Sequence, residues 1–243
     1  MSYLEINRGD YLFTKKDLHV YREEIRELNK SLNSSFPLLI VKESVDSILE
    51  KMECIELLFA RKKFNAGRLL VRPTIQMMAN LLFILEDSMS FKDRAYAYNA
   101  WCIQNIEYKI SAFISKSPKP IKDELKNEYE DLLGDKFPGL EIPEFQKYLS
   151  LQRDFFNKTG NKRAWYNILD IYQSEEKFIE DVLGQESTLI YKVYSENVHG
   201  NEVIFKISNT SNDYENHLDI LASRIIEHSF CRIILSLKKL AIH

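Results

Sequence analysis

The stretch NAGRLLVRPTIQMMANLLFILE, residues 65–86, is the most apolar part of this chain. It ends in an unbroken apolar run over 81–85, and its periodicity is that of a helix. Pro73 lies inside it, and we expect this residue to kink the helix. A helix that is apolar over most of its surface is buried by its neighbours, so we predict this one at the centre of the core.

Helical spacing of apolar residues continues on both sides of this stretch. The chain has 243 residues but only 7 glycines and 6 prolines, which favours long helices over short strands with many turns. We therefore predict an all-α helical bundle of about eight to ten helices. We assign residues 1–243 to a single helical domain and 118–185 to a less regular helical insertion within it. The main helices are predicted over 14–32, 44–64, 65–86, 91–115, 144–158, 174–183 and 213–240, with a further one ending at a motif near residue 199.

Composition narrows the class of function. The net charge is −3, from 33 basic and 36 acidic residues, so the overall field does not steer nucleic acid toward the chain. Three isolated cysteines indicate buried free thiols in a reducing compartment. The N-terminus lacks a signal-peptide pattern and the apolar runs are short, so we predict a cytoplasmic protein without membrane contact. No metal-ligand spacing or phosphate loop is present, and we predict neither a metal nor a cofactor.

The candidate for chemistry is YKVYSENVHGN, residues 191–201. Tyr191, Ser195 and His199 are spaced four apart, so they share one face of a helix that ends at a glycine, and Lys192 borders that face. Imidazole titrates near neutrality and suits proton transfer. A histidine at a helix end can equally well bond the last carbonyl groups, which is a purely structural role.

Two arginines on earlier helices complete the candidate set. Arg72 lies in the most apolar helix, where a buried guanidinium must be paired, so it is either half of a structural ion pair or the cation of a pocket. Arg94 lies among aromatic residues and can stack on them.

Trp165-Tyr166, Ser174-Glu175-Glu176-Lys177 and the Tyr191-x-x-x-Ser195-x-x-Val198-His199-Gly200 ending together resemble a bacterial family of domains of unknown function. The likeness covers roughly residues 45–235. The family also has an Arg-x-x-x-Glu in an apolar helix and a downstream Arg-x-x-x-Tyr, matched here by Arg72 to Gln76 and by Arg94 to Tyr98. Glutamine thus stands where the family has its acid.

The Val-His-Gly ending is also remotely similar to the HEPN superfamily of helical bundles, many of which are metal-independent endoribonucleases of toxin–antitoxin and phage-defence systems. Their motif places an arginine and a polar residue before the histidine. Here these places hold Tyr194, Ser195 and His199, so the arginine is missing.

The resemblance leaves two alternatives open. In the first, the chain is a HEPN-like RNA-cleaving homodimer of the defence or toxin type, with an antitoxin or defence-system protein as partner. Its expected catalytic residues are His199, Ser195, Arg72 and Arg94, and its expected substrate contacts are Lys192, Tyr191 and Asn197. In the second, the chain is a catalytically inactive helical module that binds a ligand or a protein through the same residues.

Overall fold

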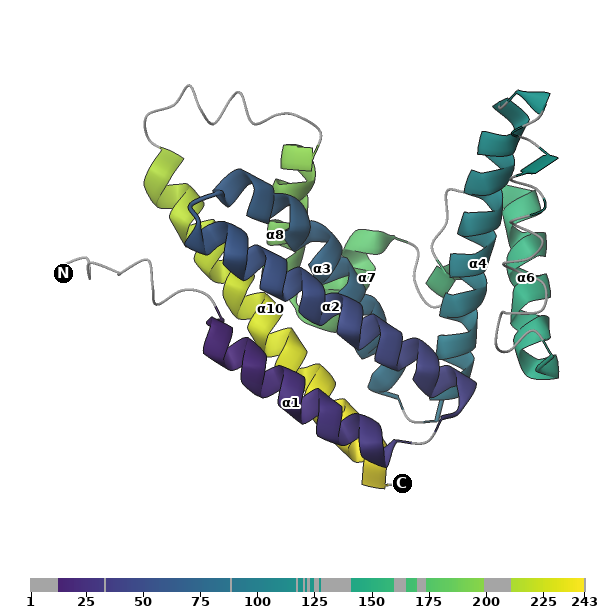
Figure 1. The fold of residues 1–243 in the computed structure, drawn as a ribbon, viewed down its shortest axis with the longest axis horizontal. Coiled ribbons are helices and arrows are strands. Elements are labelled where there is room, and N and C mark those ends of the chain that lie inside the picture. Colours follow the sequence, from purple (N-terminus) through teal and green to yellow (C-terminus); the bar gives the residue numbers. More distant parts are fainter. Residues whose placement is uncertain are drawn as a thin grey trace. The chain divides into compact units, whose positions relative to one another are not determined.

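The computed structural model describes residues 13–32, 34–87, 89–116, 141–159, 165–169, 174–198 and 211–242, with a few single residues between 118 and 127. Every regular element in these ranges is a helix and none is a strand, which confirms the all-α prediction. The elements, labelled in Figure 1 apart from the 3₁₀ helix, are α1 (Lys15–Ser31), α2 (Phe36–Ala60), α3 (Phe64–Leu85), α4 (Phe91–Lys116), α6 (Pro143–Thr159), the 3₁₀ helix η2 (Trp165–Leu169), α7 (Glu175–Leu183), α8 (Gln185–Val198) and α10 (Ser211–Ile242).

The chain divides into two compact units. The first takes its described residues from Met1–Ser34, Val41–Ser88 and Ser174–His243, and the second from Ser35–Ile40 and Met89–Gln173. The second unit overlaps the predicted insertion, 118–185, without coinciding with it, because it also contains α4 and excludes α7. That the two units form a single domain stays a prediction.

The core of the first unit is built around α3, as the sequence predicted. Every residue from Met78 to Leu85 is buried, and α3 packs against α7, α8 and α10. The last helix, α10, also packs along α1, so the first and the last of the described helices lie side by side (Figure 1). An ion pair of 2.6 Å between Arg22 and Glu53 joins α1 to α2.

By length and mean hydropathy, α3 is also apolar enough to cross a membrane. We had judged membrane contact only by the length of unbroken apolar runs, which are short. However, 67% of its most apolar window is buried inside the protein, and the core helix of a soluble protein has the same character.

A tight turn connects α2 to α3. Lys62 adopts a left-handed conformation with φ of 59°, and the amide of Lys63 donates to the carbonyl oxygen of Leu58 at 2.7 Å. The turn folds the buried ring of Phe59 onto the first turns of α3, over Gly67. A side chain at position 67 would overlap this ring, since a Cβ atom built there lies 2.1 Å from Phe59 Cε1.

A single residue, Gly184, separates α7 from α8. Its φ of +93° lies in the region that favours glycine, and its amide closes α7 on the carbonyl of Glu180 at 2.8 Å. The side chain of Ser174 caps the other end of α7 by accepting from the amide of Lys177. This sharp corner packs α7 against α8 and sets which residues of the two helices meet.

The second unit is an α4–α6 pair with η2 against it. Aromatic side chains form its core: Tyr96 contacts Phe145 at 5.7 Å between ring centroids, and Tyr98 meets Trp165 edge-on at 5.3 Å. Phe36, from the start of α2, packs on the same cluster.

Two local predictions were wrong. We expected the second helix to begin at residue 44, but α2 begins at Phe36. The proline at position 37 is tolerated there because the amide of a residue in the first helical turn needs no partner. We expected buried thiols, but Cys54 is exposed and Cys102 and Cys231 are half-buried.

The contact between Gly67 and Phe59 gives a test of the packing around α3. Gly67→Ala should lower the free energy of unfolding by about 1–2 kcal/mol, because displacing a buried ring outweighs the gain in helix propensity. Urea denaturation measures this change, and the double variant with Phe59→Leu should recover most of it. A Gly67→Ala variant more stable than the parent would contradict the close approach.

Candidate functional site

A polar seam runs between α3 and α8 inside the otherwise apolar first unit. Arg68, Arg72 and Gln76 are spaced four apart along α3, so they form one stripe. Tyr191 and Tyr194, three apart on α8, are buried and face this stripe through their hydroxyl groups. The two helices run antiparallel. Tyr194 bonds to Asp219, the partner of Arg68, whereas Tyr191, earlier on α8, bonds to Arg72, later on α3.

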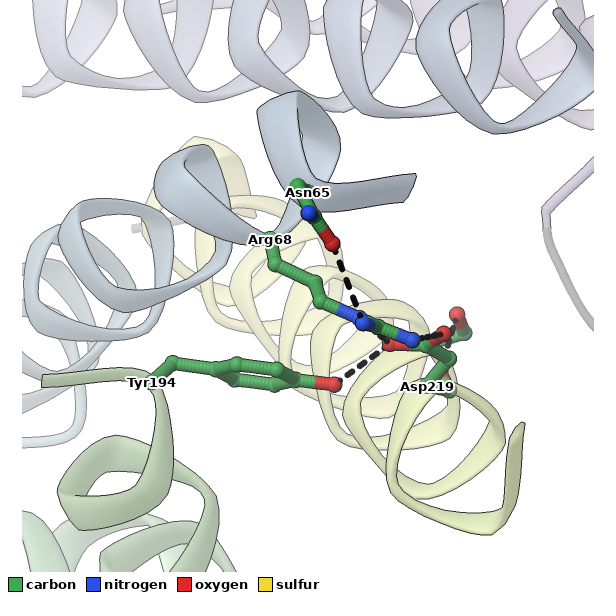
Figure 2. A network of polar contacts seen from close by, with 5 residues as sticks. Asn65, Arg68, Tyr194 and Asp219 are labelled. Atoms are coloured by element: carbon green, nitrogen blue, oxygen red, sulfur yellow. Dashed lines mark hydrogen bonds and ion pairs between the residues drawn. The ribbon is translucent and has the colours of Figure 1, made fainter. Parts of the chain in front are cut away.

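The deepest part of the seam is a buried ion pair between α3 and α10 (Figure 2). The guanidinium of Arg68 donates to both carboxylate oxygens of Asp219, from Nε at 2.9 Å and from Nη2 at 2.7 Å. The hydroxyl of Tyr194 donates to the same carboxylate at 2.6 Å, and Arg68 also donates to the side chain of Asn65 at 3.3 Å. Two-point pairing plus these further bonds compensates for the loss of water around both charges.

This arrangement explains the residue at position 194. Tyr194, which the motif resemblance aligned with the HEPN arginine, is 1% exposed, and its hydroxyl points at Asp219 (Figure 2). The cation for that carboxylate comes from Arg68 on α3. Position 194 therefore contributes to the interior of the bundle and not to an open site.

A second cluster lies one turn along α3 and reaches α7. The guanidinium of Arg72 donates to the hydroxyl of Tyr191 at 2.9 Å and also lies over that ring, 4.9 Å from its centroid. The hydroxyl of Tyr191 in turn donates to Glu175 at 2.8 Å, and the other carboxylate oxygen of Glu175 accepts from the amide of Gln76. Arg72, Gln76 and Glu175 are half-buried, so this cluster lies closer to solvent than the Arg68 pair.

The environment of Tyr191 changes its acidity. Burial raises the pKa of its phenol to about 12, the neighbouring carboxylate of Glu175 acts in the same direction, and Arg72 opposes both. The phenol therefore stays protonated at neutral pH and acts as a bridge between the guanidinium and the carboxylate. Because its ring is buried beneath Arg72, it does not present a free face on which a base could stack.

The other predicted site residues are placed as follows. Lys192 is exposed and pairs with Glu176 of α7 at 2.8 Å, and Ser195 is half-buried on α8. Asn197 lies in α8, but its side chain is outside the described part of the structure, and His199 lies outside the described residues altogether. Arg94 is a half-buried residue of α4, in the second unit, whereas Arg72 belongs to the first.

Reasoning from the sequence missed the two carboxylates that organise the seam. Asp219 lies within the apolar stripe of the last helix, and Glu175 was quoted only as part of the motif Ser174-Glu175-Glu176-Lys177. The requirement that a buried arginine be paired was applied to Arg72, and applying it equally to Arg68, one turn earlier, would have called for a second acid. Among the described residues, no group of three or more histidine, cysteine, aspartate and glutamate side chains is placed to hold a metal ion.

Comparison of the chain with protein-family models, with curated proteins and with solved structures finds no match in any of the three. The likeness to the HEPN superfamily therefore depends on the motif residues alone.

Removing one partner of the buried pair tests its role. Asp219→Ala should lower the free energy of unfolding by about 3–5 kcal/mol, because it leaves the guanidinium of Arg68 buried without its carboxylate. Replacing both partners, as Arg68→Leu with Asp219→Leu, should recover part of this loss. Glu53→Ala, which breaks the exposed pair with Arg22, is the control and should cost at most about 1 kcal/mol. Equal losses for Asp219→Ala and Glu53→Ala in urea denaturation would show that the buried pair has no special role.

The raised pKa of Tyr191 makes a prediction for alkaline pH. An unfolded tyrosine ionises near pH 10, whereas Tyr191 in the folded chain ionises at about 12, so the fold binds this proton more tightly. Its contribution to stability is complete below about pH 10 and is lost as pH rises toward 12. Stability measured by urea denaturation should therefore fall less steeply above pH 10 in Tyr191→Phe than in the parent. Tyr108→Phe, at an exposed tyrosine, should keep the slope of the parent.

Proposed function

We propose that this chain is a HEPN-like helical module that binds a phosphate-bearing ligand, RNA, and does not cleave it. Three hydrogen-bond donors carry this proposal. The hydroxyl of Tyr191 and the amide of Gln76 converge on one half-buried place between α3, α7 and α8, and the guanidinium of Arg72 donates to that hydroxyl from behind. Guanidinium and neutral donors in a fixed arrangement suit the oxygens of a phosphate group.

The spacing of the motif along the sequence is the reason that we propose no cleavage by one chain alone. Arg72 contacts α8 at Tyr191, which is eight residues before His199. With a rise of about 1.5 Å per residue, a continuous helix would separate the two levels by about 12 Å. An acid–base group must come within hydrogen-bond reach of the atom whose proton it moves, while the cation holds the same phosphate. If the helical spacing of the motif continued to position 199, Arg72 and His199 of one chain would be too far apart to act on the same phosphate, and we therefore propose binding without cleavage.

A metal-independent endoribonuclease is the second candidate, and Ser195 is the observation that favours it. Ser195 remains half-buried on α8, on the face that the spacing of the motif assigns to His199. This candidate requires a homodimer in which His199 of one chain acts beside the Arg72 cluster of the other, so the dimer would be necessary for catalysis. This candidate also includes an antitoxin or defence-system partner, as the HEPN resemblance implies, and the cytoplasmic location that we predicted from the lack of a signal-peptide pattern.

An RNA assay with EDTA present separates the two candidates. We expect the parent to bind a short fluorescein-labelled single-stranded RNA without cleaving it, and we expect Arg72→Gln to weaken binding about tenfold, as the loss of a charge-assisted hydrogen bond does. Fluorescence anisotropy measures binding, and a denaturing gel of the same samples reports cleavage. The control is Arg22→Gln, which removes an exposed arginine of α1 far from this cluster in sequence.

Cleavage by the parent that His199→Ala abolishes would overturn the non-cleaving proposal in favour of the nuclease. His228→Ala, at an exposed histidine of α10, is the matched control for that loss. Sedimentation velocity on the same preparation reports whether the homodimer that the nuclease requires is formed. Equal binding by the parent, Arg72→Gln and Arg22→Gln would exclude the Arg72 cluster as the RNA site.

A further inference from the structure

The Arg72 cluster already holds an anion, the carboxylate of Glu175. One oxygen of this carboxylate accepts from the hydroxyl of Tyr191 at 2.8 Å, and the other accepts from the amide of Gln76. Behind the hydroxyl, the guanidinium of Arg72 stabilises the negative charge through the 2.9 Å bond to Tyr191. A carboxylate and a phosphate group present similar oxygens to such donors, so the two compete for one place.

The backbone of Glu175 belongs to α7, and its side chain reaches the seam. Glu175 is the first residue of α7, directly after the capping residue Ser174, at the end of α7 that lies away from the Gly184 corner. Among the hydrogen bonds of the described residues, those from Gln76 of α3 and from Tyr191 reach Glu175 only at its carboxylate. The first turn of α7 is anchored by Phe178, whose buried ring packs on Phe83 of α3. A rotation of the Glu175 side chain alone would therefore release the carboxylate and leave the three donors in place.

The buried core of the seam supports this separation. The hydrogen bonds among Arg68, Asp219 and Tyr194 join α3, α8 and α10. Arg72 also keeps its contact with the ring of Tyr191, which does not depend on Glu175. One more charge stands nearby at the surface: Glu176, the next residue of α7, pairs with Lys192.

We propose that Gln76, Arg72 and Tyr191 form a phosphate-binding site that Glu175 closes by occupying it with its own carboxylate. This inference rests on the proposed function, since it concerns the same cluster. The site in the parent is then self-occupied, and a phosphate group binds only by displacing Glu175. Removal of the carboxylate opens the site.

Two neighbouring substitutions test this proposal with the same change of charge. Glu175→Gln removes the competing carboxylate, whereas Glu176→Gln removes an exposed one that pairs with Lys192. We expect Glu175→Gln to bind the short labelled RNA about tenfold more tightly than the parent, by fluorescence anisotropy, and Glu176→Gln to change the affinity by much less. Inorganic phosphate should compete with the RNA at lower concentration for Glu175→Gln than for Glu176→Gln.

The remaining variants separate the possible failures. Glu175→Gln combined with Arg72→Gln should lose the gain. Equal gains for Glu175→Gln and Glu176→Gln would overturn the proposal, because they would show a general effect of charge. An affinity that depends on Arg72 but is unchanged by Glu175→Gln would overturn the closed site and leave the proposed function standing. An affinity independent of Arg72 in every background would overturn both.

Glu175→Ser, which suits the first turn of a helix, provides a second carboxylate-free variant whose folding is checked by circular dichroism.

Discussion

The two-point ion pair between Arg68 and Asp219 sets the arrangement of the first unit. It joins residues 151 positions apart in the chain, from the central helix α3 and the last helix α10, and both partners are buried. Tyr194 adds α8 to the same carboxylate. A charged pair inside an apolar bundle tolerates few geometries, because each donor and acceptor has to find its partner without help from water. The pair therefore specifies how α3, α8 and α10 face one another.

Charge balance along the seam bears on function. Arg68 is matched by Asp219, Arg72 by Glu175 through Tyr191, and Lys192 by Glu176. The cations that the motif suggested in the first unit thus each have an acidic neighbour. In the site that we propose, a ligand phosphate binds by exchanging with a carboxylate, and not by entering an unoccupied positive field. This is consistent with a chain whose net charge is only −3.

Much of the fold was predictable from the sequence. Helical periodicity and the scarcity of glycine and proline identified the helices, and the apolar run over 81–85 identified α3 as the core helix. The site was less predictable. The spacing of Tyr191 and Ser195 placed them on one face of α8, but Tyr191 turned out to be buried and to support Arg72. The acids Glu175 and Asp219 gave no local signal, since a single carboxylate on a helix is usually solvated.

The sequence by itself determined the helices, the central place of α3 and the need for acids to pair with its arginines. These depend on periodicity and on the cost of burying a charge, both of which are local properties of the chain. Only the tertiary structure decided which acids are the partners of these arginines: Asp219 pairs with Arg68, and Glu175 interacts with Arg72 through Tyr191. It also decided that position 194 points inward. These choices depend on how α3, α7, α8 and α10 pack, because partners so far apart in sequence are brought together only by the packing of whole helices.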